Sequence, residues 1–304
     1  MVKFTLRQCA YFQAVAAHGG IAQAARALNL AQPSVAQALE KLEQVTGLVL
    51  FERHHARGLT LTLQGRRFLE QVNRLDLQAR QLEREAMALA TGTGGEIRLG
   101  MFWSLSPFFA AGLARGFAKQ VPGATIRLTE MSLAELPERL RDGALDCAIT
   151  YDRGGNMAGL SLQPLTALRP TVLLAADHPL ARRRSIRLAD LASEPYVMFD
   201  APGSRSYFDS LLAEHGINPR IAFTSTTLEG VRSAVGAGFG FTILVVHPPS
   251  STTYDGGMVK IRPIKDDVRP LNIVLATRDD AGPELLLKQF AGHVSAWFAA
   301  RRGA

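Results

Sequence analysis

The chain has 304 residues, enough for two domains of ordinary size, and 47% of them are hydrophobic, so each domain can bury a core. The formal net charge of +7 favours a polyanionic partner, and residues 1–67 carry eight Lys and Arg against three Glu. Two distant cysteines argue against a disulfide framework or a zinc site, and no apolar run is long enough to span a membrane, so we expect a cytoplasmic protein without metal or other cofactor.

Three helices are expected in the first 47 residues. The first covers residues 6–18 and ends at Gly19-Gly20. Apolar residues then keep the three-and-four spacing of amphipathic helices at 21, 24, 25 and 28, and again at 35, 39, 42 and 45. Only a turn fits between these runs, and Pro33 suits the start of the second helix. The pattern predicts a helix-turn-helix that offers its second helix to a major groove of double-stranded DNA. The candidate DNA-binding residues of this helix are Gln32, Pro33, Ser34 and Gln37.

Residues 48–61 predict a two-stranded wing with its turn at 55–58. Arg53 and Arg57 lie on or beside that turn. A charged hairpin is commonly just solvated. Next to a recognition helix, however, these two arginines favour contact with DNA phosphates or the minor groove.

A single long helix is expected over residues 64–90. Its apolar residues recur by alternating steps of four and three, which is a heptad pattern: Phe68, Val72, Leu75, Ala79, Leu82, Ala86 and Leu89. An apolar stripe this narrow would stay exposed to water on a lone helix, so it has to pack against another apolar surface. A second copy of the helix is the simplest one and predicts a homodimer or homotetramer, while packing on the chain's own second domain is the alternative. The sequence TGTGG of residues 91–95 is typical of a flexible linker.

From Glu96 onward, strand and helix patterns alternate. Strands are expected at 96–102, 124–130, 145–151, 171–177, 195–200, 220–225, 240–246, 258–264 and 271–278, and helices at 107–120, 134–142, 204–215, 228–237 and 283–301. Such alternation implies parallel sheets covered by helices. We expect two α/β lobes, one of residues 93–165 with 268–304 and one of residues 166–267, with crossovers near 163–168 and 266–269.

Residues of the first 65 positions also match a known pattern. They are Ala24, Ala25, Leu28, Gln32, Pro33, Ser34, Leu42, Glu43, Gly47, Leu50, Phe51, Arg53, Gly58, Leu61, Thr62 and Gly65. With them the chain resembles the LysR-type transcriptional regulators over about its first fifth. It departs from the usual pattern at Ala31 and Ala36, where the family has serine, and at Gln37, where arginine is common.

This resemblance implies the fold class. The N-terminus would be an all-α winged helix-turn-helix with a long linker helix, and the C-terminus an α/β two-lobed, periplasmic-binding-protein-like effector domain. The corresponding domains are residues 1–63 for DNA binding, 64–92 for dimerisation and the joint, and 93–304 for effector binding.

A ligand of two α/β lobes binds in the crevice at the carboxyl ends of the strands. Polar residues that follow the expected strands give the candidate effector-binding set: Ser104, Ser106, Ser132, Ser204, Arg205 and Thr226. Ser104 and Ser106 open a helix, where hydroxyls and free N–H groups suit an anion, although plain N-capping explains them as well. Arg205 adds a guanidinium suited to carboxylates. In the resembled family, hydroxyls after the first strand and the threonine segment line the inducer pocket. The hydroxyls, the free helix N–H groups and Arg205 together predict a small anionic effector.

No catalytic motif is found, so we do not expect an enzyme. Gly236, Gly238 and Gly240 spell GxGxG, but they follow a helix and precede a strand, the reverse of a dinucleotide fingerprint. The favoured hypothesis is a ligand-responsive transcriptional regulator. The alternatives are an architectural DNA-binding protein without an effector and an enzyme fused to a DNA-binding domain.

Overall fold

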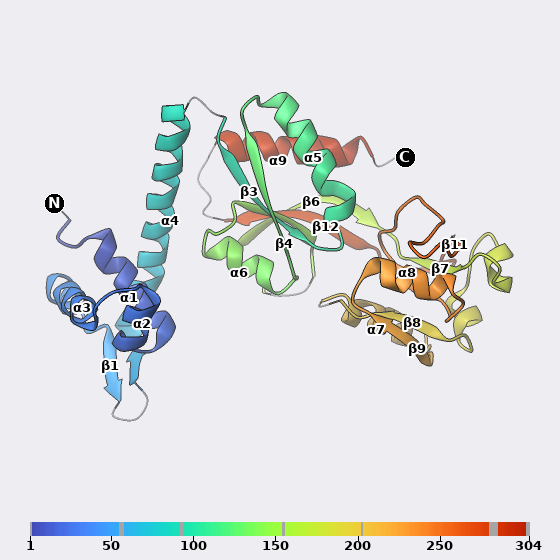
Figure 1. Ribbon diagram of the computed structural model, residues 1–304, viewed down its shortest axis with the longest axis horizontal. Coiled ribbons are helices and arrows are strands. Elements are labelled where there is room, and N and C mark those ends of the chain that lie inside the picture. Colours follow the sequence, from blue (N-terminus) through green and yellow to red (C-terminus); the bar gives the residue numbers. More distant parts are fainter. Residues whose placement is uncertain are drawn as a thin grey trace. The chain divides into compact units, whose positions relative to one another are not determined.

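The computed structural model describes residues 2–54, 58–91, 94–153, 156–201, 203–279 and 285–301. The chain forms two compact units, Met1–Gly92 and Thr93–Ala304 (Figure 1). Each unit has its own hydrophobic core. In the described part of the chain, no helix has the length and apolar character needed to cross a membrane.

The first unit packs three helices and a wing against the start of a long helix. Its elements are α1 (Leu6–His18), α2 (Ile21–Ala27), α3 (Gln32–Thr46), β1 (Phe51–His54), β2 (Gly58–Leu61) and α4 (Leu63–Thr91). The hydroxyl of Thr5 and the side chain of Gln8 form a capping box at the start of α1. The buried ring of Phe12 lies at the centre of the core, 5.4 Å from the ring of Phe51 and 5.5 Å from that of Phe68.

The wing is fastened to the end of α1 through two glycines with left-handed backbone. Gly19 closes α1 with φ of 69°, and Gly58 opens β2 with φ of 77°. The N–H of Leu59 donates to the carbonyl of Gly19 at 2.9 Å, and a Cβ at position 58 would lie 2.6 Å from that same oxygen. Position 58 therefore needs glycine for both its conformation and its close approach.

The heptad stripe of α4 divides into two parts. Val72 is buried in the core of the first unit, and Phe68 and Leu75 pack against that core. Gln13 of α1 also donates to Asn73 at 2.9 Å. Farther along, Leu82 is 67% exposed on this chain, while the side chain of Leu89 lies outside the described residues. The first half of the stripe is thus covered by the chain's own winged unit, an arrangement that neither sequence alternative included.

The first lobe of the second unit is a five-stranded sheet in the order β4-β3-β5-β12-β6. Its strands are β3 (Glu96–Phe102), β4 (Thr125–Met131), β5 (Cys147–Tyr151), β6 (Leu160–Leu168) and β12 (Leu271–Arg278). Helices α5 (Ser106–Gln120) and α9 (Leu285–Ala299) lie on one face and α6 (Glu135–Arg141) on the other (Figure 1). The last strand and the last helix of the chain, β12 and α9, thus lie in this lobe.

The second lobe has mixed strand directions. Its elements are β7 (Thr171–Ala175), the 3₁₀ turns η1 (Pro179–Arg182) and η2 (Leu188–Leu191), β8 (Tyr196–Phe199), α7 (Arg205–Glu214), β9 (Ile221–Ser225), α8 (Leu228–Gly236), β10 (Thr242–Leu244) and β11 (Val259–Pro263). β7 pairs antiparallel with β10 and β11, whereas β8 pairs parallel with β9. The N–H of Val197 donates to the carbonyl of Phe241 at 2.8 Å and links the two sheets.

Two details of the predicted sheets are wrong. Residues 163–168, expected as a crossover, belong to β6, which pairs antiparallel with β12. The strands are also not all parallel, since β12 runs antiparallel to β5 and the pairs of β7 are antiparallel. The antiparallel partners of β12 come before the second lobe in the chain, so β12 enters the sheet on the return from that lobe and not through a strand–helix–strand unit. The glycine run contains Gly240, whose φ of 141° favours glycine, as expected for a tight turn before β10.

Candidate DNA-binding and effector-binding sites

Helix α3 presents one polar face and buries the other. Val35, Leu39 and Leu42 are buried against the first unit's core. The four sequence-predicted residues of this helix are all exposed: Gln32, Pro33, Ser34 and Gln37. The structure thus gathers them on the solvent side of α3, where a recognition helix carries its base contacts.

The start of α3 lacks a side-chain cap. Ala31 is the N-cap residue and no side-chain hydrogen bond closes the helix there, while Pro33 lies in the first turn. Ser, Thr, Asp or Asn at such a position stabilises a helix by about 1 kcal/mol relative to Ala. Pro33 has no N–H and the N–H of Ser34 donates to the carbonyl of Ala31 at 3.1 Å, so in the first three residues of α3 the N–H of Gln32 is the one left for an external acceptor such as a DNA phosphate.

The wing carries the other candidate DNA contacts. β1 and β2 pair antiparallel, with Arg53 opposite Leu59 in the register. The side chain of Arg53 and the whole of Arg57 lie outside the described residues. Their contacts with DNA stay predictions from the sequence.

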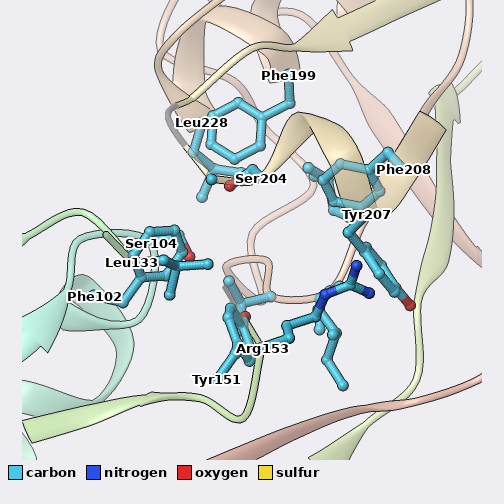
Figure 2. Close-up of a pocket in the computed structure, with 15 residues that line it drawn as sticks. Phe102, Ser104, Leu133, Tyr151, Arg153, Phe199, Ser204, Tyr207, Phe208 and Leu228 are labelled. Atoms are coloured by element: carbon cyan, nitrogen blue, oxygen red, sulfur yellow. The ribbon is translucent and has the colours of Figure 1, made fainter. Parts of the chain in front are cut away.

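A cavity lies between the two lobes of the second unit (Figure 2). Its volume is about 30 Å³, which is room for about two water molecules. Most of its lining is aromatic or aliphatic: Phe102, Leu133, Tyr151, Phe199, Tyr207, Phe208, Leu228, Leu244, Val245, Val246 and Leu271. Ser104, Ser204, Gly203 and Arg153 supply the rest.

Two predicted hydroxyls, Ser104 and Ser204, line this cavity. Ser104 follows β3 and lines the cavity together with Tyr151, whose burial raises the pKa of its phenol above the ordinary range. The N-cap of α5 is Leu105, with no side-chain cap, so Ser104 and Ser106 do not act as capping residues. Ser204 lies before α7 on the second lobe, and it makes no side-chain cap there either.

The charged residue of the cavity is one that the sequence analysis missed. Of the described residues that line it, Arg153 alone is charged. It comes two residues after β5, so the rule that placed Ser104 after β3 could have found it. The guanidinium carbon lies 4.8 Å from the centre of the Tyr207 ring. Figure 2 shows the two side chains next to each other. Arg153 stands on the first lobe and Tyr207 on α7 of the second, so this contact bridges the lobes.

Tyr207 is itself fixed by the segment that joins the lobes. Its hydroxyl donates to the carbonyl of Arg269 at 3.0 Å. Burial raises the pKa of this phenol to about 12, although the nearby Arg153 charge acts in the opposite direction. The phenol is therefore a protonated donor at neutral pH, and its ring offers a fixed face to the guanidinium.

The remaining predicted effector residues lie outside the cavity lining. Arg205 forms ion pairs with Asp209 at 3.2 Å and Asp200 at 3.6 Å, and its side chain is 52% exposed. The hydroxyl of Ser132 donates to Glu135 at 2.6 Å, a bond that lowers the pKa of this carboxyl. Ser106 is buried and Thr226 is exposed. The neighbouring Thr227, rather than Thr226, caps α8 by accepting from the N–H of Gly230.

A buried arginine fixes the later part of the loop that follows β10. Arg232 of α8 is fully buried and donates through Nη2 to the carbonyls of Ser250 and Thr252 at 2.9 and 3.0 Å. Glu229 pairs with it at 2.9 Å. These bonds fix the loop that follows β10, whose first residues, Val245 and Val246, line the cavity.

Comparison with known proteins shows matches over both units. The family model described as "Bacterial regulatory helix-turn-helix protein, lysR family" matches residues 6–66, and the model "LysR substrate binding domain" matches residues 90–299. The HTH-type transcriptional regulator CfxR of Cupriavidus necator is 32% identical over 245 residues, which are 80% of this chain and 76% of that protein.

Solved structures cover nearly the whole chain. HinK, a LysR family transcriptional regulator from Pseudomonas aeruginosa, is 33% identical with a TM-score of 0.65 and covers 97% of this chain and 99% of its own. Full-length CbnR, solved in complex with its target DNA, is 25% identical with a TM-score of 0.59, covering 99% and 100% of the two chains.

Proposed function

This chain belongs to the LysR family of transcriptional regulators, and we propose that its residues 1–63 bind double-stranded DNA, residues 64–92 pair two copies, and residues 93–304 bind a small-molecule effector. As a member of this family it is a regulator with a DNA-binding helix-turn-helix and an effector-binding domain, and not an enzyme. We place its action in the cytoplasm, where the DNA is.

DNA readout rests on the exposed face of α3. Gln32 and Gln37 can pair through their amides with adenine edges, and Ser34 can reach a phosphate or a base. The arginine that is common in the family is absent at position 37, so α3 carries less positive charge than the recognition helix of members that have it. We assign the missing phosphate attraction to Arg53 and Arg57 of the wing.

Pairing of two copies rests on the second half of α4. Leu82 is 67% exposed on the single chain, and it continues the heptad stripe whose first half is already covered. An exposed leucine at a heptad position is buried when two such helices pair. A homodimer follows, and a homotetramer if dimers associate further.

The observation that carries effector binding is the cavity between the lobes. Ser104 and Ser204 provide hydroxyls from opposite lobes, and Arg153 provides a positive charge among apolar side chains. A few polar groups in a mainly apolar pocket are typical of a small-molecule site. The single positive charge favours an anionic effector.

One experiment on the full-length chain tests the whole proposal. Melting temperature is measured against a series of small carboxylates, and any compound that raises it is then added to a binding assay with DNA selected by the protein. We expect the compound to change the DNA affinity or the footprint without being consumed. A stabilising compound that leaves DNA binding unchanged would contradict the coupling, and its chemical conversion would indicate an enzyme.

A further inference from the structure

We propose that Arg153 is the group that binds the effector's anion, and that the cleft therefore selects a monocarboxylate with an apolar body. The inference rests on the proposed function, because it names the effector class of that same cavity. The juxtaposition that carries it is a lone guanidinium, fixed on an aromatic ring, at the edge of an otherwise apolar cavity (Figure 2).

The guanidinium has unused hydrogen-bonding capacity. Arg153 is partly buried, and the part of the chain that the structure describes gives it the ring of Tyr207 as a neighbour but no hydrogen-bonded or ion-paired acceptor. The nearest carboxylate in sequence, Asp152, instead accepts from the amide of Asn272 at 2.7 Å. An arginine carries five N–H donors in a planar fork that matches a carboxylate.

Tyr207 holds that fork in place. Stacking on a ring restricts the guanidinium, and the ring cannot swing away because its hydroxyl is bonded to the carbonyl of Arg269. A donor held before the ligand arrives loses less conformational entropy on binding. Arg205, the guanidinium expected from the sequence, differs in both respects, since it is exposed and already paired with Asp200 and Asp209.

Charge balance sets the class of ligand. One guanidinium compensates one negative charge, and the other described residues of the lining are uncharged. A dicarboxylate or a phosphate dianion would bury a second charge without a partner, which is costly. The apolar side chains instead favour a hydrocarbon body, which Ser104 and Ser204 can fix through one or two hydrogen bonds.

The test combines two ligands with two side chains in the full-length protein. Butanoate and benzoate are compared with their neutral amides, for wild type and Arg153→Gln, by calorimetric titration at neutral pH. We expect the acids to bind the wild type about 10- to 100-fold more tightly than the amides, since hydrogen bonds between charged partners are the strong ones. In Arg153→Gln that preference should vanish, while amide binding stays unchanged.

Three further proteins sharpen the result. Arg153→Lys should keep part of the preference for acids, because it retains the charge but loses the fork. Tyr207→Phe keeps the ring, and should weaken acid binding less than Tyr207→Leu, which removes it. Arg205→Gln is the matched control and should behave as wild type.

The outcomes separate this inference from the proposed function. If the acids bind and alter DNA affinity but Arg153→Gln keeps the full preference for acids, the assignment of Arg153 is overturned and the regulator remains. If inorganic phosphate or a dicarboxylate such as succinate binds more tightly than both monocarboxylates, or if neither monocarboxylate binds, the ligand class is overturned. If additionally no carboxylate of the wider series alters DNA binding, the proposed function fails as well.

Discussion

Replacing Leu82 by alanine should weaken pairing of two copies without unfolding either unit. Alanine keeps the helix propensity of α4 and removes three carbons from a side chain that is 67% exposed on the single chain. Burying a CH₂ group stabilises by about 0.8 kcal/mol, and pairing can bury only the exposed two-thirds of this side chain. Loss of the three carbons should therefore weaken pairing by about 1.5 kcal/mol per copy. A symmetric pair buries two copies of Leu82, so the dissociation constant should rise by about 100-fold.

Sedimentation velocity over a wide concentration range measures this constant. Arg74→Ala, an exposed change on the same helix outside the heptad stripe, is the matched control and should keep wild-type pairing. Leu75→Ala should behave differently from both, because Leu75 packs on the core of its own unit. It should lower the melting temperature of the first unit and reduce its free energy of unfolding by about 1–3 kcal/mol. If the dissociation constant of the Leu82→Ala pair lies within about threefold of the wild-type value, the exposed stripe is not the interface.

The recognition helix, the wing and the cavity give three further predictions. Gln37→Ala should relax base preference at one position per half-site, by about 1–3 kcal/mol in a binding-site selection, and an unchanged motif would place the base contacts elsewhere. Arg53→Ala should weaken binding to all sequences alike and reduce the salt slope by about one, so a loss confined to some sequences would refute phosphate contact. Ser104→Ala should shift the effector dose–response curve by about two- to tenfold, the effect of one neutral hydrogen bond. Thr226→Ala, which changes an exposed residue outside the cavity, should leave the curve in place, and equal curves for both variants would argue against the cavity.

The winged unit was accessible from the sequence because its signals are local. The spacing of apolar residues defined α1 and α3, and the glycines at 19 and 47 end both helices with left-handed backbone. Strand β6 was not accessible in the same way. Its burial alternates imperfectly, it contains Pro164, and its partner β12 lies about a hundred residues later, so only the tertiary pairing makes it a strand.

The predicted site shows the same division between local and distant information. A rule about strand ends placed Ser104 in the cavity, and the same rule applied after β5 leads to Arg153. Arg205 satisfied a similar rule, but Asp209 stands four residues later on the same helix, where an ion pair with Arg205 is expected. Arg153 also has a carboxylate beside it in the sequence, Asp152, and only the structure shows that this carboxylate accepts from Asn272 instead.

The narrowness of the cavity gives Arg153 a part in regulation as well as in recognition. About 30 Å³ cannot hold a carboxylic acid of several carbons, so an effector must separate the lobes to enter. The contact between Arg153 and Tyr207 bridges the lobes at the edge of the cavity, so it has to persist through this movement for the guanidinium to be held for the ligand. A carboxylate on the guanidinium stabilises the liganded arrangement of the lobes by about 1.5–3 kcal/mol, the value of a hydrogen bond between charged partners. A ligand shifts an equilibrium only by the difference in its affinity for the two states. It follows that an acid paired with Arg153 favours the liganded arrangement of the lobes, whereas its neutral amide, even at saturation, should change DNA binding less.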